Sequence, residues 1–399
     1  MIQEELAING GRPVRDSYLI FGKPDIREEE IQEVIDCLRS GWVGTGPRVA
    51  KFQEKIKSYV NATHALAVNS CTAGLHLSMI ASNLGPGDEV ITTPMTFAAT
   101  ANVIEHVGAT PIFADCKSED MLIDPHEIEK KITPHTKAIV PVHLAGRSCD
   151  MDPIMRMAKA RGLKVISDAA HALGSEYKGK KIGSFSDFTV FSFYATKNLV
   201  TAEGGMVTTS NEEGLAKLAT YSLHGMSRDA WKRYSDAGFK HYLVEAAGFK
   251  YNMTDMQAAI GLRQMDRFEA MQTRRKEIWH RYMRELQELP IDLPAVEDPA
   301  SQHSYHLFTI FPRLGELKAD RDTILQALHK ENIGVGVHYV ALHLHPYYQQ
   351  KYGYKRGDFP NAENISDRTI SIPMGSNLSD TDVSDVIYAI RKVLSHYKR

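Results

Sequence analysis

Between about residue 60 and residue 210, short apolar runs alternate with amphipathic stretches. The apolar runs are rich in β-branched residues, and they predict buried strands at 64–69, 89–94, 110–116, 137–143 and 164–169. The stretches between them have apolar positions at helical spacing, at 71–85, 96–108, 124–133 and 150–162. This alternation is typical of crossover units, and it predicts a mostly parallel sheet with helices on both faces.

Two further apolar runs, 187–194 and 205–210, follow with only a short segment between them. So short a connection leaves no room for a crossover helix, and it predicts an antiparallel or otherwise unusual pairing near the end of the sheet. After about residue 255 the pattern changes. A long polar helical stretch at 254–289 precedes an apolar run at 306–314 and helical patterns at 320–334 and 379–397.

These patterns predict an α/β fold with a doubly wound, mostly parallel sheet and a smaller C-terminal α+β domain. We expect an N-terminal arm at 1–20, a large domain at 21–260 and a small domain at 261–399.

The charge balance argues against nucleic acid or an anionic membrane as a partner. The 399 residues have a formal net charge of −2, with acidic and basic side chains evenly mixed. No stretch approaches the roughly 18 uninterrupted apolar residues of a membrane span, and the first residues lack the apolar part of a signal peptide. We therefore expect a soluble, cytoplasmic protein.

The cysteines and histidines do not predict a metal site. Cys37, Cys71, Cys116 and Cys149 form no C-x-x-C pair, as expected in a reducing compartment. The histidines at 338, 343 and 345 have no carboxylate or cysteine partners at ligand spacing.

Candidate chemistry follows the ends of the predicted strands, where ligands of open α/β sheets bind. Asp168 ends one strand, and His171 comes three positions later. The Asp168 carboxylate either caps the following turn or balances a buried cationic ring nitrogen. Phe97 follows another strand, and it is either a core residue or the stacking partner of a flat ligand.

A third strand end is followed by small hydroxylated residues and a predicted helix. Free N–H groups and the positive dipole end at a helix N-terminus attract phosphate, and Ser70 and Thr72 add hydroxyl groups there. An ordinary helix N-cap explains the same residues.

Lys197 lies in FSFYATKNLVTAEGGMV (191–207), an apolar and glycine-containing run rather than a charged one. A desolvated lysine has a lowered pKa, so its neutral amine can form a Schiff base with an aldehyde or ketone. Together with a phosphate site, a stacking aromatic ring and a carboxylate for a protonated pyridine, it describes a site for pyridoxal 5′-phosphate.

The chain resembles the DegT/StrS family of sugar aminotransferases, which have the fold-type I architecture. NSCTAGLHL, PVHLAG, DAAHALGSEYKGKKIGS and FSFYATKN…AEGGM occur in the order of the family, and the resemblance extends from 40–53 through 248–264 to 360–363.

The resemblance implies a role for each matching residue. Lys197 would hold the cofactor and move the proton, Asp168 would pair with the pyridine nitrogen, and His171 would contact the phenolic oxygen. The phosphate would be held by Thr72, Ala73 and Ser192, and Phe97 would lie on the ring face. Asn252 matches an asparagine that reaches the cofactor phosphate of the neighbouring subunit, which implies a homodimer with shared active sites.

The implied reaction moves an amino group from L-glutamate to C4 of a nucleoside-diphosphate-linked keto sugar, with UDP-4-keto sugars as the first choice. GDP-4-keto-6-deoxymannose and 3-keto sugars are alternatives. Candidate substrate-binding residues are Trp42, Arg228, Lys250 and His338, each of which is equally explained as a surface charge or a structural ring.

Two other classes of protein stay open on the sequence. One is a regulatory protein that binds the cofactor without turnover, and the other is a pyridoxal enzyme acting on amino acids. Some relatives have histidine in place of the lysine and act as dehydratases, whereas this chain has Lys197 together with Asp168.

Overall fold

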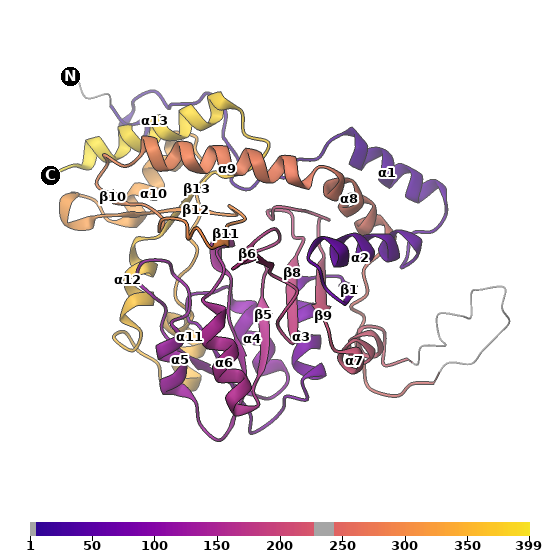
Figure 1. The fold of residues 1–399 in the computed structure, drawn as a ribbon. Coiled ribbons are helices and arrows are strands. Elements are labelled where there is room, and N and C mark those ends of the chain that lie inside the picture. The colour runs from indigo at the N-terminus through magenta and orange to yellow at the C-terminus, as the bar shows by residue number, and fades with distance from the viewer. Residues whose placement is uncertain (1–4, 227–242) are drawn as a thin grey trace.

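A seven-stranded sheet forms the centre of the larger part of the molecule (Figure 1). The computed structural model describes residues 5–226 and 243–399. In the order β1-β9-β8-β5-β4-β2-β3, the strands are β1 (His64–Val68), β9 (Gly205–Thr209), β8 (Phe188–Ser192), β5 (Lys164–Asp168), β4 (Thr136–Val140), β2 (Glu89–Thr92) and β3 (Thr110–Phe113).

Only β9 runs against its neighbours in this sheet. The pairs β5–β8, β4–β5, β2–β4 and β2–β3 are parallel, whereas β9 is antiparallel to both β1 and β8. The segment 193–204 between β8 and β9 holds no helix, so the chain has to return in the opposite direction. The mostly parallel sheet and the unusual pairing are both confirmed.

Helices cover both faces of the sheet, because successive strand residues point to opposite sides. In β8, Val190 belongs to the same buried cluster as residues of α3 (Cys71–Ala81), α4 (Ala98–His106) and α7 (Glu212–Ser222). Its neighbour Phe191 points to the other side and belongs to a cluster with residues of α2 (Pro47–Tyr59), α5 (Pro125–Lys131) and α6 (Met151–Arg161). Among the described residues, no helix has the length and apolarity that a membrane span needs.

A second hydrophobic core lies around a small antiparallel sheet. This sheet has the order β10 (Ile291–Asp292), β12 (Phe308–Pro312) and β13 (Ile370–Ile372). Three helices pack on it, α9 (Phe268–Glu285), α10 (Arg321–Lys330) and α13 (Asp380–Tyr397). The expected α+β texture of the C-terminal part is therefore present.

Residues near the N-terminus pack in the second core, and residues from the C-terminal part pack in the core of the large sheet. Leu6, near the N-terminus, is buried in the second core, where Glu331 accepts hydrogen bonds from the backbone of Ala7 and Val14. Conversely, α11 (Pro346–Tyr352) and α12 (Pro360–Arg368) bury Tyr348 and Ile365 against the large core. The domain boundaries expected from the sequence stay predictions.

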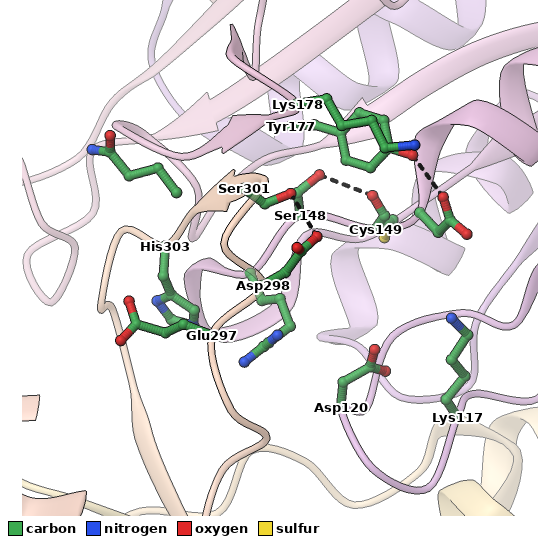
Figure 2. A pocket seen from close by; sticks show the side chains of 13 residues that line it. Lys117, Asp120, Ser148, Cys149, Tyr177, Lys178, Glu297, Asp298, Ser301 and His303 are labelled. Atoms are coloured by element: carbon green, nitrogen blue, oxygen red, sulfur yellow. Dashed lines mark hydrogen bonds between the residues drawn. The ribbon is translucent and has the colours of Figure 1, made fainter. Parts of the chain in front are cut away.

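A third, very small sheet borders a polar pocket of about 340 Å³, called here the side pocket (Figure 2). The strands of this third sheet are β11 (Ser301–Gln302), β6 (Glu176–Tyr177) and β7 (Lys180–Lys181). In the pocket wall, the Tyr177 hydroxyl donates to Asp150, and the Ser301 hydroxyl donates to Asp298.

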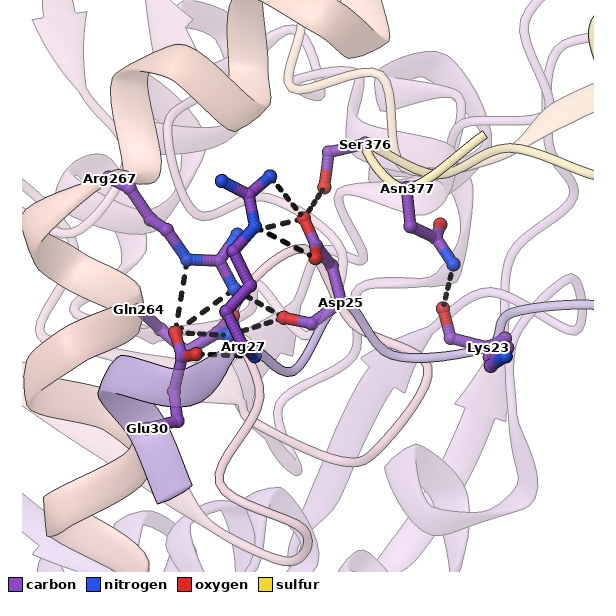
Figure 3. A network of polar contacts seen from close by, with 8 residues as sticks. All are labelled: Lys23, Asp25, Arg27, Glu30, Gln264, Arg267, Ser376 and Asn377. Carbon is purple, nitrogen blue, oxygen red and sulfur yellow. Dashed lines mark hydrogen bonds and ion pairs between the residues drawn. The ribbon is translucent and has the colours of Figure 1, made fainter. Parts of the chain in front are cut away.

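The helical stretch expected at 254–289 consists of two helices. The first, α8 (Asp255–Asp266), ends at Arg267, whose φ of −119° and ψ of 11° are not helical, and α9 follows. The Arg267 guanidinium binds Asp25 at 2.8 Å and Glu30 at 3.0 Å (Figure 3). Asp25 lies just before α1 (Glu28–Arg39) and Glu30 lies in its first turn, so both partners are far away in sequence.

The Arg267 contacts belong to a network that joins three parts of the chain. Gln264 donates to Glu30, which is only 1% exposed, and Ser376 donates to Asp25 from the loop after β13. Burial opposes the ionisation of Asp25, but hydrogen bonds from Arg27 and Arg267 outweigh it and lower the pKa of this carboxyl. The break between α8 and α9 is thus fixed by tertiary contacts.

We expect Arg267→Ala to destabilise the protein by about 3 kcal/mol, because the buried Glu30 carboxylate would lose its cation. Arg263→Ala, one turn earlier, is the matched control. Its ion pairs with Glu33 and Asp266 are half exposed, so it should cost less than about 1 kcal/mol. Thermal unfolding of the two variants measures the difference, and equal losses would contradict the role of the buried network.

Candidate active site

The candidate residues gather at the carboxyl edge of the sheet because of the strand register. Val68 at the end of β1 lies opposite Gly205, which lies opposite Ser192 at the end of β8. Asp168, the last residue of β5, pairs with Val190. The loop 193–204, with Lys197, begins directly after this row of strand ends.

Asp168 is a buried carboxylate held by two donors. Its side chain is 5% exposed, and it accepts hydrogen bonds from the Thr100 hydroxyl at 2.8 Å and from the backbone N–H of Ala170 at 3.1 Å. Burial raises the pKa of Asp168, while these two donors and the charge of Lys197 act in the opposite direction. The described part of the chain contains no cation in an ion pair with Asp168.

Thr100 is a residue of this site that the sequence analysis missed. It is fully buried in the first turn of α4, and its hydroxyl lies 2.8 Å from that of Thr96. An ionised carboxylate only accepts, so Thr100 donates to Asp168 and Thr96 donates to Thr100. Thr96 lies just before α4 and Thr100 lies in its first turn, and only the folded structure shows that their hydroxyls form a chain to Asp168.

Lys197 is a largely buried amine close to this carboxylate. Burial lowers its pKa to about 8, and the negative charges of the Cys71 thiolate form and Asp168 oppose this shift. The backbone N–H of Lys197 donates to the Tyr194 carbonyl at 2.9 Å, in the turn that starts the loop. The amine therefore loses its proton near pH 8, well below the pH at which an ordinary lysine does.

His171 is a neutral ring with a defined tautomer. It is 7% exposed, and burial, followed by the charges of Lys197 and His338, lowers its pKa well below the usual value. The backbone N–H of Ala145 donates to Nδ1 at 3.2 Å, so the ring proton is on Nε2. Nε2 lies 3.4 Å from the Tyr339 hydroxyl.

Phe97 is 61% exposed although it is a large aromatic residue next to buried groups. It is the N-cap residue of α4, and its ring centroid lies 6.1 Å from that of Tyr339. Burial raises the pKa of Tyr339, so its hydroxyl stays protonated. An open aromatic face at this edge leaves room for a flat ligand.

The N-terminus of α3 lies against the start of β9. Ser70 is the N-cap, and its hydroxyl accepts from the backbone N–H of Ala73 at 3.1 Å, as the ordinary reading of these residues predicts. Thr72 is exposed in the same turn. A Cβ on Gly205 would lie 2.7 Å from the Ser70 carbonyl carbon, so only glycine allows this approach.

Ser192 and Asn252 have partners within their own chain. The Ser192 hydroxyl accepts from the backbone N–H of Tyr194 at 3.3 Å. The Asn252 amide donates to the Thr45 hydroxyl at 2.6 Å, whereas its buried Oδ1 has no partner among the described residues.

The candidate substrate-binding residues differ in solvent exposure and in charge. Trp42 is 49% exposed and donates to the Thr45 carbonyl, and Lys250 is exposed. Burial lowers the pKa of His338 to about 4, and its Nδ1 lies 2.9 Å from the Ser371 hydroxyl. A neutral His338 offers a hydrogen bond rather than the positive charge that a diphosphate partner provides. Arg228 lies outside the described residues.

The comparisons with known proteins agree with this geometry. The chain is 50% identical over 384 residues to the spore coat polysaccharide biosynthesis protein SpsC of Bacillus subtilis (strain 168), covering 95% of this chain and 98% of that protein. The putative sugar aminotransferase Spr1654 from Streptococcus pneumoniae, solved in PMP and PLP forms, is similar in structure. Its PMP form has 36% identity and a TM-score of 0.88, with 95% of this chain and 98% of that chain covered.

A further similar structure is that of DesI in the presence of its TDP-sugar product. It has 30% identity and a TM-score of 0.85, with 98% of this chain and 97% of that chain covered. The model of the DegT/DnrJ/EryC1/StrS aminotransferase family matches residues 24–391. The resemblance seen in the sequence is confirmed, and the chain is a transaminase that belongs to the DegT/DnrJ/EryC1/StrS aminotransferase family.

Proposed function

We propose that the protein transfers an amino group from L-glutamate to C4 of a nucleoside-diphosphate-linked 4-keto sugar, with pyridoxal 5′-phosphate as cofactor. The observation that supports it most is Lys197, a buried amine whose pKa is lowered to about 8 at the same sheet edge as the buried Asp168. SpsC is described as a polysaccharide biosynthesis protein, Spr1654 as a sugar aminotransferase, and DesI was solved with a TDP-sugar product, which supports a sugar acceptor for polysaccharide synthesis.

Two features of the site fit the cofactor. The first is the ionisable, buried carboxylate of Asp168, which has no cation in an ion pair among the described residues and would be balanced by a protonated ring nitrogen. The second is the open face of Phe97 at the same edge. The cofactor, when bound, supplies an electrophilic carbonyl group and a ring that accepts electron density from the reacting carbon.

Each protein group then has a defined task. Lys197 would hold the cofactor, Phe97 would lie on its ring, and the first turn of α3 with Thr72 and Ser192 would face its phosphate. The Nε2–H of neutral His171 is a donor that suits an anionic phenolic oxygen. Thr100 and Ala170 favour the ionised form of Asp168 against the effect of burial.

Lys197 would move the proton. Its neutral Nζ takes a proton from the α-carbon of the amino donor, and in the second half of the cycle it delivers a proton to the sugar carbon that receives nitrogen. A base of this kind works best when its pKa lies near the working pH. Burial of Lys197 produces that match.

A second copy of the chain completes the site in this proposal. Trp42, Val43 and Met256 are large apolar side chains that are more than a third exposed. The backbone contact between Gly44 and Asp255 brings their segments together next to Asn252. A partner subunit would cover these side chains, and Asn252 would reach the partner's cofactor phosphate.

The identity of the sugar nucleotide is the most specific part of the proposed function. A UDP-4-keto sugar is the first choice, and GDP-4-keto-6-deoxymannose and 3-keto sugars are the alternatives.

We place the reaction in the reducing cytoplasm. The four cysteines are free thiols, which is compatible with that compartment.

The amine of Lys197 should titrate near pH 8 in the cofactor-free protein. Because its pKa is lowered, the amine is charged below this pH and reactive above it. Modification by an amine-specific reagent should therefore increase through pH 8, whereas ordinary lysines change near about pH 10.4. Mass spectrometry of the peptide that contains Lys197 measures this midpoint, and a midpoint above pH 10 would refute the lowered pKa.

Lys197→Ala should reduce transamination by at least about 1,000-fold and abolish borohydride labelling of that peptide, because the base and the attachment point are both lost. Asp168→Asn should reduce turnover by at least about 100-fold while the label remains. Lys217→Ala on α7, which removes an ion pair with Glu213, is the control and should keep full turnover. Retained turnover in Lys197→Ala would exclude the proposed mechanism.

A panel of sugar nucleotides tests the acceptor. The enzyme is first converted to its amino form with glutamate, and each UDP-, TDP- or GDP-linked 4-keto or 3-keto sugar is then offered. We expect the UDP-4-keto sugars to restore the starting absorbance spectrum fastest. A spectrum restored only by amino acid-derived keto acids would rule out a sugar aminotransferase.

A further inference from the structure

A short segment of the second core reaches into the Lys197 site. Residues 303–306, here called the HSYH segment, lie just before β12. The Ser304 hydroxyl donates to the His171 carbonyl at 2.7 Å, and the backbone N–H of His306 donates to the Ala145 carbonyl at 3.0 Å. Ala145 is the residue whose N–H fixes the tautomer of His171.

Asn198, next to Lys197, joins the lysine loop to this segment. It is 5% exposed, and its amide nitrogen donates to the Ser304 carbonyl at 2.6 Å and to Gln272 of α9 at 3.1 Å. A backbone carbonyl only accepts, so the nitrogen of Asn198 has to face Ser304 and the oxygen has to face His306. Both amide hydrogens and the oxygen of Asn198 are thereby engaged.

His306 completes this arrangement. Its Nδ1 lies 2.9 Å from the Asn198 oxygen, 108 positions away in sequence, and its ring centroid lies 4.3 Å from that of His171. Burial, followed by repulsion from the protonated forms of His171 and Lys197, lowers the pKa of His306 well below its usual value. The ring is therefore neutral, and Nδ1 is the protonated nitrogen that donates to Asn198.

We propose that His306 and Asn198 are a positioning pair for the transamination site. His306 holds the ring of His171 by direct packing, and through Asn198 it holds the loop that carries Lys197. Neither residue takes part in proton transfer, because the His306 proton and the Asn198 amide are committed to each other and to Ser304 and Gln272. The proposal rests on the proposed role of Lys197.

Three substitutions separate the ring contact from the hydrogen bond. His306→Phe keeps a ring against His171 but loses the donor to Asn198. His306→Asn loses the ring but keeps an N–H group near the position of Nδ1. Asn198→Ala removes all three hydrogen bonds of the amide.

The matched control is His303→Phe in the same segment. His303 is also buried, but its Nδ1 accepts from the backbone N–H of Tyr305 and its ring packs on Trp279. It lines the side pocket rather than the Lys197 site (Figure 2). This variant reports what the loss of a buried histidine in the HSYH segment does by itself.

The first measurement is the pH midpoint of Lys197 modification in the cofactor-free protein. Loosening the loop would admit water to Nζ, so the midpoint in His306→Phe and Asn198→Ala should increase from about 8 toward the ordinary value of about 10.4. His306→Asn should stay nearer to the wild-type midpoint, and His303→Phe should match it.

The second measurement is turnover of the loaded enzyme. His306→Phe and Asn198→Ala should lower kcat by about 10- to 100-fold with little change in the KM for glutamate, because misplaced groups affect the reacting state. The double variant should be no slower than the worse single variant, since the two residues act as one unit.

The outcomes distinguish this proposal from the proposed function. Folded His306→Phe and Asn198→Ala proteins with wild-type midpoint and kcat would overturn the positioning pair. The same changes in His303→Phe would also overturn it, because they would then reflect a general loss of packing. If the wild-type protein itself shows no midpoint near pH 8 and no turnover, the proposed function fails instead. Should His306→Phe not fold, Asn198→Ala decides the question alone.

Discussion

The removal of one amine from water is the constraint on which the site depends. Lys197 extends from a loop between two antiparallel strands, next to a carboxylate that is itself buried. Charged groups in such a place are unstable unless they are neutralised or paired. The fold meets this requirement in two ways, because Lys197 readily loses its proton and Asp168 receives hydrogen bonds from Thr100 and Ala170. Neutral His171 and His306 add no further charge.

Much of the architecture could be read from the sequence because it depends on local periodicity. Alternating apolar runs and amphipathic stretches predicted the parallel sheet, and the short segment before Gly205 predicted the reversed strand β9. Strand ends then predicted where Asp168, Phe97 and Lys197 would meet. The order of the motifs along the chain indicated the family, because these motifs are local in sequence.

What the sequence did not reveal depends on contacts between distant residues. Thr100 lies 68 positions from Asp168, and His306 lies 108 positions from Asn198, so no local pattern relates them. The end of α8 at Arg267 was hidden by a continuous helical pattern, because its cause is a pair of acids in another part of the chain. The uncharged state of His338 follows from burial, which a residue type alone does not specify.

The placement of Leu6 has a consequence for how this protein is made. Its core is built by residues between Ile278 and Leu394, and Glu331 and Lys392 complete the polar contacts around the arm. A ribosome synthesises Leu6 well before these partners, so Leu6 has no place to dock until the residues that build the second core have emerged. The segment around Leu6 therefore stays exposed to chaperones and proteases while the residues up to Leu394 are being synthesised.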